Sequence, residues 1–534
     1  MTKILRQIAP AILCVATMAL AWSPTALAVN VDSLLALTIG GRPALDSART
    51  LRSYVVHGRA TLNGLEGSFT GCFVAPDKTY LDLETTLFTL VQAYDGRIAW
   101  QQDHAGQITE IRGMERSELM NGLYFDSFSH LLPDRMEGGR RYVGLEAVDD
   151  RPCHRIDFYP LYHDTISLFI DRASGQTVLM RQTLDELPSE TRYSDFRLVG
   201  GILWPFRTTM KTIGAPLQIE FEYREILVNQ PVDPALFLMK RTEATNFNFP
   251  VEADSTVVPV KYIDGHLYAE VRLGQRRVWM ILDSGASASM LDRQLTGDLG
   301  LEPRGSLPAK GMSGYETIDL IRLDTLAVGD LTLYGVTVGS VDLSNLAGGL
   351  ESGLEFGGIL GYDFLSSFPI LIDYQRPQIT IYRPESFHPA VGGAEIPFHL
   401  TLQVPTVRAN LAGVPGDFIV DLGNPFGLLV HYPFVEQNRL DTLLHDVEPL
   451  GMTVGGIGGQ VGGRTAMAST FSLGEVLLSS IRVILMDSEA GLAGSTELAG
   501  NVGNLIWEGF QVLFDYRSSR MILYPAGSAD EARP

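Results

Sequence analysis

An aspartate at the end of an apolar run is the residue of this sequence best placed for acid–base chemistry. Asp283 follows the run of residues 278–282, and Ser284 and Gly285 come directly after it. The run predicts a buried strand that would hold the carboxylate in place, while the serine hydroxyl can hydrogen-bond and glycine lets the backbone turn. Asp, Ser and Gly are also common in ordinary turns, which is the alternative interpretation of these three residues.

A second segment, 75 residues further on (358 − 283), fits the first. Ile359-Leu360-Gly361 stands there, followed by apolar runs at 368–374 and 379–382. In this order the segments resemble the retropepsin-like aspartic peptidases. In that family each lobe has a catalytic Asp-Thr/Ser-Gly loop, a flap and a hydrophobic-hydrophobic-Gly segment. The resemblance implies that Asp283 is catalytic and that Ile359, Leu360 and Gly361 form a strand that passes under the active-site loop and packs it.

The same pattern recurs near the end of the chain. Asp421 ends the apolar run 418–420 and is followed by Leu422 and Gly423. A single offset of 142 (500 − 358) matches later segments of the two halves without a gap, and an offset of 145 (471 − 326) matches the segments between. Two repeats imply two facing lobes, an intramolecular version of the retropepsin dimer. The offset of 142 pairs Gly358 with Gly500, Gly361 with Gly503, Asp373 with Asp515, Tyr374 with Tyr516 and Tyr382 with Tyr524.

The resemblance implies that Asp283 and Asp421 form one catalytic pair. Peptide hydrolysis by this route uses two carboxylates that share one proton, with a water between them. Like charges held close together cannot both ionise, so one Asp stays protonated. The ionised carboxylate takes a proton from the water, and the protonated one polarises the carbonyl and later protonates the leaving amine. The sequence does not decide which Asp is the acid, because such a pair titrates as a unit.

The second repeat departs from the family pattern at Leu422, where the family has Thr or Ser. That hydroxyl normally joins the hydrogen bonds that brace the two active-site loops, and Leu cannot replace it. Gly423 is retained. The second lobe is therefore either a diverged but working half or a structural remnant. In a third case lobe 1 would pair with lobe 1 of another chain and leave lobe 2 inert.

Glycine clusters mark a candidate flap in each repeat, because glycines give a hairpin tip that can open and close. The alternative is a surface hairpin that never contacts substrate. Neither cluster has the pattern of a nucleotide-binding loop. The candidate flap residues are Gly311, Met312, Ser313 and Gly314 in the first repeat and Gly456, Ile457 and Gly458 in the second.

The first 28 residues predict a secretory signal peptide. Lys3 and Arg6 precede an apolar run from about residue 8 to 22, and Ala26-Leu27-Ala28 gives a small-x-small cleavage site. The competing interpretation is a membrane anchor, but the run is short. The prokaryotic style of the signal suggests a bacterial periplasm. Removing the signal leaves a formal net charge of −23 (−21 − 2), which argues against nucleic acid as a partner.

Two cysteines, Cys72 and Cys153, remain after the signal. In an oxidising compartment they could form a disulfide, or they could stay as two buried thiols. The His, Cys and Asp spacings resemble no metal site. We expect no metal and no cofactor, since the carboxylate chemistry requires none.

The region before the repeats alternates apolar and polar residues in strand-like runs, which suits a large antiparallel sheet with one wet face. The segments 193–205 and 232–237 resemble periplasmic lipoprotein-carrier-type domains, which are incomplete β-barrels with a helix in the concave face. That resemblance implies a surface able to hold a lipid or a peptide. A purely structural or substrate-presenting module is the alternative.

These features together predict a mainly β protein. Its parts are a signal peptide at 1–28, an antiparallel half-barrel-like domain at 29–245, lobe 1 at 255–385 and a diverged lobe 2 at 393–526. The resemblance implies a secreted aspartic endopeptidase that acts on protein or peptide substrates and has no transmembrane anchor once the signal is cleaved. The alternative class is a non-catalytic peptide- or lipid-binding protein on the same fold.

Overall fold

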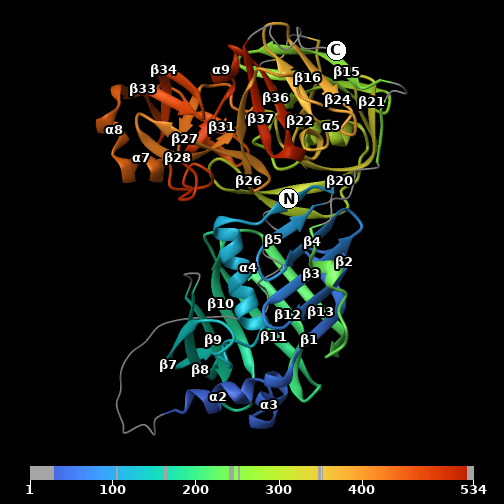
Figure 1. Cartoon of the computed structure of the whole chain (residues 1–534), viewed down its shortest axis with the longest axis vertical. Helices are drawn as coiled ribbons and strands as arrows, with labels where there is room; N and C mark the ends of the chain where they lie inside the picture. The colour runs from blue at the N-terminus through green and yellow to red at the C-terminus, as the bar shows by residue number, and fades with distance from the viewer. Residues whose placement is uncertain are drawn as a thin grey trace. The chain divides into compact units, whose positions relative to one another are not determined.

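The computed structural model describes residues 29–103, 106–161, 165–239, 246–249, 253–346, 350 and 353–525. The signal peptide expected at 1–28 lies outside these residues. The chain divides at residues 242/243 into two compact units, called here the N-terminal unit and the C-terminal unit. Both consist mostly of strands (Figure 1), so the expectation of a mainly β fold is confirmed.

The N-terminal unit is built on one antiparallel sheet of 13 strands, ordered β6-β5-β4-β3-β2-β1-β13-β12-β11-β10-β9-β8-β7. Strand β12 alternates as the sequence predicts, whereas every residue of β9 is buried. On β12, Trp204, Phe206 and Met210 are buried, whereas Arg207 and Lys211 are exposed. The strands are β1 (Ser53–Leu62), β2 (Leu65–Val74), β3 (Lys78–Thr85), β4 (Thr89–Tyr94), β5 (Ala99–Gln102), β6 (Ile108–Glu110), β7 (Gly138–Val148), β8 (Arg151–Pro160), β9 (Ile166–Asp171), β10 (Thr177–Leu184), β11 (Leu187–Val199), β12 (Ile202–Thr212) and β13 (Leu217–Val228).

Helix α4 (Gly113–Asp126) packs on one face of this sheet (Figure 1). Its Leu119, Leu123 and Phe125 are buried, and the Phe125 ring lies 5.5 Å from that of Phe158 on β8. The unit also holds helices α2 (Val31–Thr38) and α3 (Arg42–Thr50) and the short helix η2 (Pro234–Phe237).

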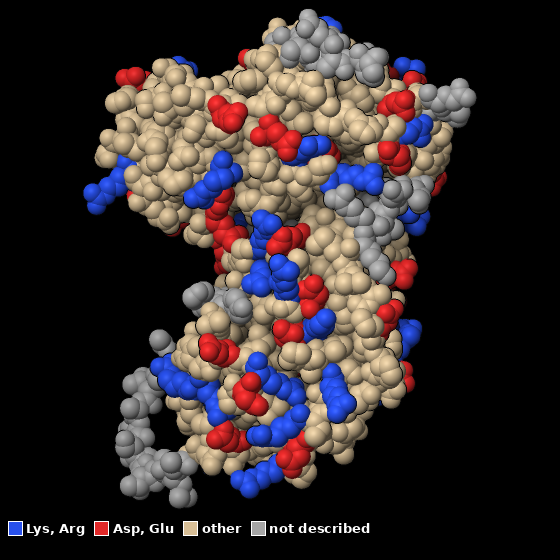
Figure 2. All heavy atoms as spheres, viewed as in Figure 1, with Lys and Arg blue, Asp and Glu red and all other residues tan. Residues whose placement is uncertain are grey.

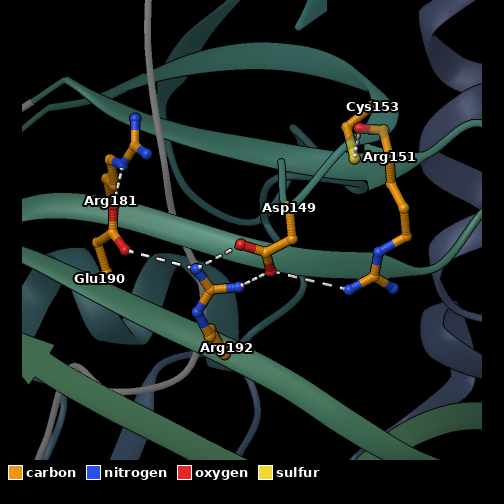
Figure 3. A network of polar contacts seen from close by, with 6 residues as sticks. All are labelled: Asp149, Arg151, Cys153, Arg181, Glu190 and Arg192. Carbon is orange, nitrogen blue, oxygen red and sulfur yellow. Dashed lines mark hydrogen bonds and ion pairs between the residues drawn. The ribbon is translucent and has the colours of Figure 1, made fainter. Parts of the chain in front are cut away.

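The two cysteines of the N-terminal unit are free and buried, so the disulfide between Cys72 and Cys153 that the sequence left open is not formed. Cys72 lies on β2 and Cys153 on β8, and six strands stand between these two in the sheet order. At about 5 Å per strand the thiols are far beyond the reach of a disulfide. Cys153 instead donates a hydrogen bond of 3.5 Å to the carbonyl of Arg151 (Figure 3).

Charged side chains of both signs are interspersed on the visible face of the N-terminal unit (Figure 2). Many of them pair. Arg192 on β11 contacts both Asp149 and Glu190, and Arg151 lies 3.9 Å from Asp149 (Figure 3). Arg181 on β10 pairs with Glu190 from the other side. The pairs that Asp149 makes with Arg151 and Arg192 are exposed to solvent on both sides, so each contributes little to stability.

The C-terminal unit contains two lobes that share one hydrophobic core. Its main cluster joins Val278 and Leu360 of the first lobe to Phe418 and Val502 of the second. The first lobe has β15 (Ser255–Ile263), β16 (His266–Leu273), β17 (Arg276–Leu282), β18 (Met290–Asp292), α5 (Arg293–Asp298), β19 (Ser306–Lys310), β20 (Tyr315–Val328), β21 (Leu331–Val341), β22 (Phe356–Leu360), α6 (Tyr362–Leu365), β23 (Ile370–Asp373) and β24 (Gln378–Tyr382), with the two-residue β14 (Phe247–Asn248) paired to β21.

The second lobe has a similar order of elements, with α8, β31, β32 and η4 in addition. It has β25 (Ala394–Pro397), β26 (His399–Thr401), β27 (Val404–Leu411), β28 (Val414–Val420), β29 (Leu428–Val430), α7 (Tyr432–Asn438), α8 (Leu440–Leu443), β30 (His445–Pro449), β31 (Val454–Gly456), β32 (Gly459–Val461), β33 (Gly463–Leu473), β34 (Val476–Met486), β35 (Gly500–Val502), α9 (Asn504–Trp507), β36 (Phe510–Asp515), η4 (Tyr516–Ser518) and β37 (Arg520–Pro525).

An antiparallel sheet joins the lobes in the order β15-β24-β23-β36-β37-β25, in which β23 of one lobe pairs with β36 of the other. Leu371 stands opposite Leu513 in this pair, and these two residues are also related by the repeat offset of 142 (513 − 371). A residue that pairs with its own repeat mate in an antiparallel ladder lies on the axis that exchanges the two strands. The pairing therefore indicates a pseudo-twofold relation between the lobes at Leu371 and Leu513.

Candidate active site

The structure brings Asp283 and Asp421 together. Asp283 follows β17 and Asp421 follows β28, and their carboxyl groups share a hydrogen bond. A Cβ atom at Gly285 would lie 2.5 Å from Oδ1 of Asp421, and one at Gly423 would overlap the carboxyl group of Asp283. Each glycine thus leaves room for the opposite carboxylate, so only glycine fits at these two positions.

Both aspartates are held by equivalent backbone contacts. The Asp283 N–H donates to the carbonyl of Leu360 at 3.0 Å, and the Asp421 N–H donates to that of Val502 at 2.9 Å. Strand β22 runs parallel to β17, and β35 runs parallel to β28. The segments Ile359-Leu360-Gly361 and 501–503 therefore lie beside the two active-site loops and support them.

The hydroxyl brace between the loops is present on one side only. Ser284 is fully buried; its Oγ donates to the Val420 carbonyl at 2.6 Å and accepts from the Leu422 N–H at 3.0 Å. Leu422 is also fully buried, but it packs in the main core and has no hydroxyl to return the contact. The backbone of the second loop is thus tied to the first loop by a single serine.

Asp421 has a side-chain partner that Asp283 lacks. Asn501 Nδ2 donates to Asp421 Oδ2 at 2.6 Å, and Asn501 Oδ1 lies 2.8 Å from Nε2 of His431. His431 is fully buried, and its Nδ1 lies 3.1 Å from the Leu498 carbonyl. The repeat offset places apolar Ile359 at the corresponding position of the first lobe (501 − 142). The two carboxyl groups therefore stand in different polar surroundings.

These surroundings move the two pKa values apart. Burial raises the pKa of Asp283 well above its ordinary value, and the neighbouring charge of Asp421 raises it further. Burial also raises the pKa of Asp421. Two backbone N–H donors oppose the effect of burial at each aspartate, but only Asp421 also accepts from a side chain, that of Asn501. Donors to a carboxylate favour its charged form. We infer that the pair holds its proton on Asp283 and its charge on Asp421.

Another polar residue ties the second loop to the first lobe. Asn504 Nδ2 donates to the Leu422 carbonyl at 2.7 Å and to the Gly265 carbonyl at 2.8 Å, and its Oδ1 accepts from the Tyr374 hydroxyl at 2.7 Å. Asn504 is fully buried. This link holds the loop that lacks its own hydroxyl.

The candidate flaps are hairpins whose tips meet. Residues 311–314 join β19 to β20, and Ile457 and Gly458 join β31 to β32. The Met312 N–H donates to the Ile457 carbonyl at 2.8 Å, and the Ser313 hydroxyl donates to the Gly458 carbonyl. Gly456 stands next to this tip, where a Cβ would lie 3.3 Å from that of Met312.

Each flap tip packs on the opposite lobe. Ile457 contacts a small cluster of the first lobe that includes Ala286 and Ile359. Met312 contacts a cluster of the second lobe that includes Leu429 and Ile484. Because Ala286 belongs to the Asp283 loop, the second flap reaches the immediate surroundings of the carboxyl pair.

Sequence reasoning missed Asn501, His431 and Asn504 as site residues. The repeat offset pairs Ile359-Leu360 with Asn501-Val502, and this loss of apolar character is the sequence signal that marks Asn501. No sequence signal linked Asn501 to His431, because they are 70 residues apart (501 − 431) and meet only through the pairing of β29 with β35.

Within the described ranges, no group of three or more His, Cys, Asp or Glu side chains could hold a metal ion. Over the same part of the chain, no helix is both long and apolar enough to cross a membrane.

Comparison with known proteins places part of this unit in a family. Residues 269–364 match the aspartyl protease family, and this stretch includes the Asp283 loop, the first flap and Ile359-Leu360-Gly361. This piece of the chain is therefore retropepsin-like, with a peptidase-like fold. No curated protein matches the chain.

Several solved structures are similar to parts of the chain. An aspartic proteinase from Irpex lacteus is 13% identical, with 52% of this chain and 100% of that chain covered and a TM-score of 0.34. A DUF1329 family protein from Desulfovibrio piger is 14% identical, with 39% and 97% covered and a TM-score of 0.29. A putative outer membrane lipoprotein-sorting protein domain from Vibrio parahaemolyticus is 8% identical, with 34% and 88% covered and a TM-score of 0.27.

Proposed function

We propose that this protein is an aspartic endopeptidase that hydrolyses peptide bonds with a water activated by Asp283 and Asp421. The observation that carries the proposal is the reciprocal fit of the two loops. Each active-site glycine lies against the carboxyl group of the other lobe, so both carboxyl groups face one buried site. A carboxyl pair that shares one proton is the arrangement this hydrolysis requires.

The asymmetry of the pair assigns the roles. Asp421, stabilised as a carboxylate by Asn501, accepts a proton from the water as the water attacks the peptide carbonyl carbon. Asp283 donates its hydrogen bond to the carbonyl oxygen and stabilises the charge that develops there. When the tetrahedral intermediate collapses, the C–N bond breaks and the leaving amine takes a proton from the pair. The products are a carboxylic acid and an amine.

The substrate class follows from the flaps. We infer that an extended polypeptide segment binds between the flap tips and the carboxyl pair, and that the hydrogen-bonded tips part to admit it. The N-terminal sequence supports a site of action outside the cytoplasm, in a bacterial periplasm, after cleavage behind Ala28. The acidic composition supports a protein or peptide partner rather than a nucleic acid.

A second candidate is a peptide-binding protein that keeps this fold without hydrolysis. The observation that favours it is Leu422, which removes half of the hydroxyl brace. In that case an extended peptide would bind under the flaps and leave unchanged.

Cleavage of an unfolded protein distinguishes the two candidates. We expect the full chain to cleave reduced, alkylated casein at acidic to near-neutral pH, and we expect a pepstatin-like transition-state mimic to inhibit it. Asp283→Asn should remove the cleavage, since an amide can neither carry the shared proton nor act as a base. A folded sample that cleaves nothing between pH 3 and 8 and ignores the inhibitor would favour the binding protein.

A further inference from the structure

A cavity in the N-terminal unit lies between α4 and the sheet, apart from the carboxyl pair of the C-terminal unit. Its volume is about 70 Å³, and its walls come from β1, β2, β3, β4, β13 and α4. Tyr54, Phe69 and Tyr223 line it from three neighbouring strands, and Leu119 lines it from the helix. All four are buried, so the walls are largely aromatic and apolar.

Two hydrogen-bond acceptors in this wall lack partners. Asp126, the last residue of α4, lies beside Tyr54 in the cavity wall, and its buried Oδ1 has no hydrogen-bond partner among the residues that the structure describes. Gln92 on β4 donates through Nε2 to Oε1 of Gln101 at 3.3 Å. Its own buried Oε1 has no donor within the described part of the chain. A buried acceptor left unsatisfied costs about 1–3 kcal/mol, so a bound molecule that donates to these two oxygens is favoured in this cavity.

The surroundings favour a donor that carries a positive charge. Asp126 stands at the C-terminal end of a 14-residue helix, where the helix dipole disfavours an anion and favours a cation. Aromatic rings beside an ammonium group add cation–π attraction. A primary ammonium has three donors and no acceptor, so one such group can serve two acceptors at once.

We propose that this cavity binds the primary ammonium group of a small apolar amine, with Asp126 as the counter-ion and Gln92 as a second acceptor. The alkyl part packs against Phe69, Tyr223 and Leu119. Burial raises the pKa of the Asp126 carboxyl to about 7, so a bound cation also offsets the cost of ionising this group.

Calorimetric titration of the full chain tests the site with three probes of equal chain length: butylamine, butanol and butyrate. At pH 8 we expect butylamine to bind about tenfold more tightly than butanol, because a charge-assisted hydrogen bond is stronger than a neutral one, and we expect butyrate not to bind. Asp126→Asn keeps an acceptor for Tyr54 but removes the charge. This variant should lose the preference for the amine, whereas Asp150→Asn, on the exposed turn between β7 and β8, should keep it.

A second variant, Gly71→Val, distinguishes loss of the binding site from loss of the fold. A Cβ at Gly71 on β2 meets only the Tyr80 carbonyl, at 3.9 Å, so Gly71→Val fills the cavity from a wall that has room for it. We expect this variant to melt near the wild-type temperature and to bind none of the probes. Two results would overturn the proposal: no binding of butylamine to the wild type, or butylamine binding that Asp126→Asn and Gly71→Val leave unchanged.

Discussion

At the residue scale, the two aspartates differ in what surrounds them rather than in their own placement. Both directly follow a strand, and both accept from the N–H of a glycine two residues on; Asp421 is buried and Asp283 is partly buried. Only Asp421 also accepts from a side-chain amide, since Asn501 stands where the first lobe has Ile359. A carboxylate with more donors is the better anion, so one substitution in the second lobe decides which partner carries the charge.

Asn501→Leu should lower the cleavage activity on the acid side of the pH–activity profile. Loss of the Asn501 donor destabilises the Asp421 carboxylate, so Asp421 becomes protonated and inactive at a higher pH. A hydrogen bond to a charged group contributes about 1.5–3 kcal/mol, so kcat/KM on the acid limb should fall roughly ten- to a hundredfold. The control is Asn410→Leu, at an exposed position of β27. If kcat/KM of Asn501→Leu fell at the same acidic pH as that of the wild type, Asn501 would not affect the ionisation of Asp421.

Asp283→Asn should make the fold more stable, and increasingly so as pH rises. Because the folded-state pKa of Asp283 is raised, the folded protein keeps a proton that the unfolded chain has already lost, and wild-type stability falls as pH rises through that interval. Asparagine does not titrate, so the free energy of unfolding of the variant does not fall by this amount, which is about 1.4 kcal/mol per pH unit. Urea denaturation at pH 5 and 8 measures the free energy of unfolding of the variant and the wild type. Asp324→Asn, at an exposed position, is the control. A constant difference between variant and wild type would contradict the raised pKa.

Leu422→Thr should destabilise the protein. A restored hydroxyl could rebuild the missing brace only if Leu422 did not pack in a core. The structure places Leu422 in the main core, fully buried. We expect a loss of about 2–4 kcal/mol in the free energy of unfolding, against less than about 1.5 kcal/mol for the control Leu422→Ile. A threonine variant that is as stable as the wild type and more active would show that the hydroxyl finds a partner.

At the scale of elements, the flaps were predictable as glycine-rich hairpins, but their mutual contact was not. Residues 311–314 and 455–459 are turn-forming in isolation. Met312 and Ile457 are 145 residues apart in the sequence (457 − 312) and meet only because the two lobes face each other. No local residue pattern encodes such a contact. The contact between His431 and Asn501 and the wide separation of Cys72 and Cys153 in the sheet also depend on long-range strand pairing, so they could not be predicted from local patterns.

Two glycines of the first flap should respond differently to alanine. At Gly311 a Cβ would overlap the Ile457 carbonyl, so Gly311→Ala should push the flap tips apart and lower kcat/KM by about tenfold or more. At Gly314 a Cβ meets nothing within 4 Å, so Gly314→Ala should stay within about twofold of the wild type. Equal activities of the two variants in a peptide-cleavage assay would mean that the tips do not meet during turnover.

At the scale of the whole molecule, the repeat offset expected from the sequence agrees with the register of one strand pair in the C-terminal unit. The offset of 142 relates Leu371 to Leu513, and these residues face each other between β23 and β36. The mainly β character and the two aspartates that follow strands could be predicted because local residue patterns encode them. The polar contacts that distinguish the lobes could not, since they depend on long-range pairing of strands.

The most direct test of the central claim, that each lobe supplies one carboxylate to a single site, is the cleavage rate of Asp421→Asn beside that of Asp283→Asn. With two carboxyl groups in one site, either substitution alone should abolish cleavage of unfolded casein, and the double variant should be no worse than either single one. If Asp421→Asn cleaves at the wild-type rate while Asp283→Asn does not cleave, the pairing of Asp283 with Asp421 is not the working site, and two first lobes from separate chains form it instead.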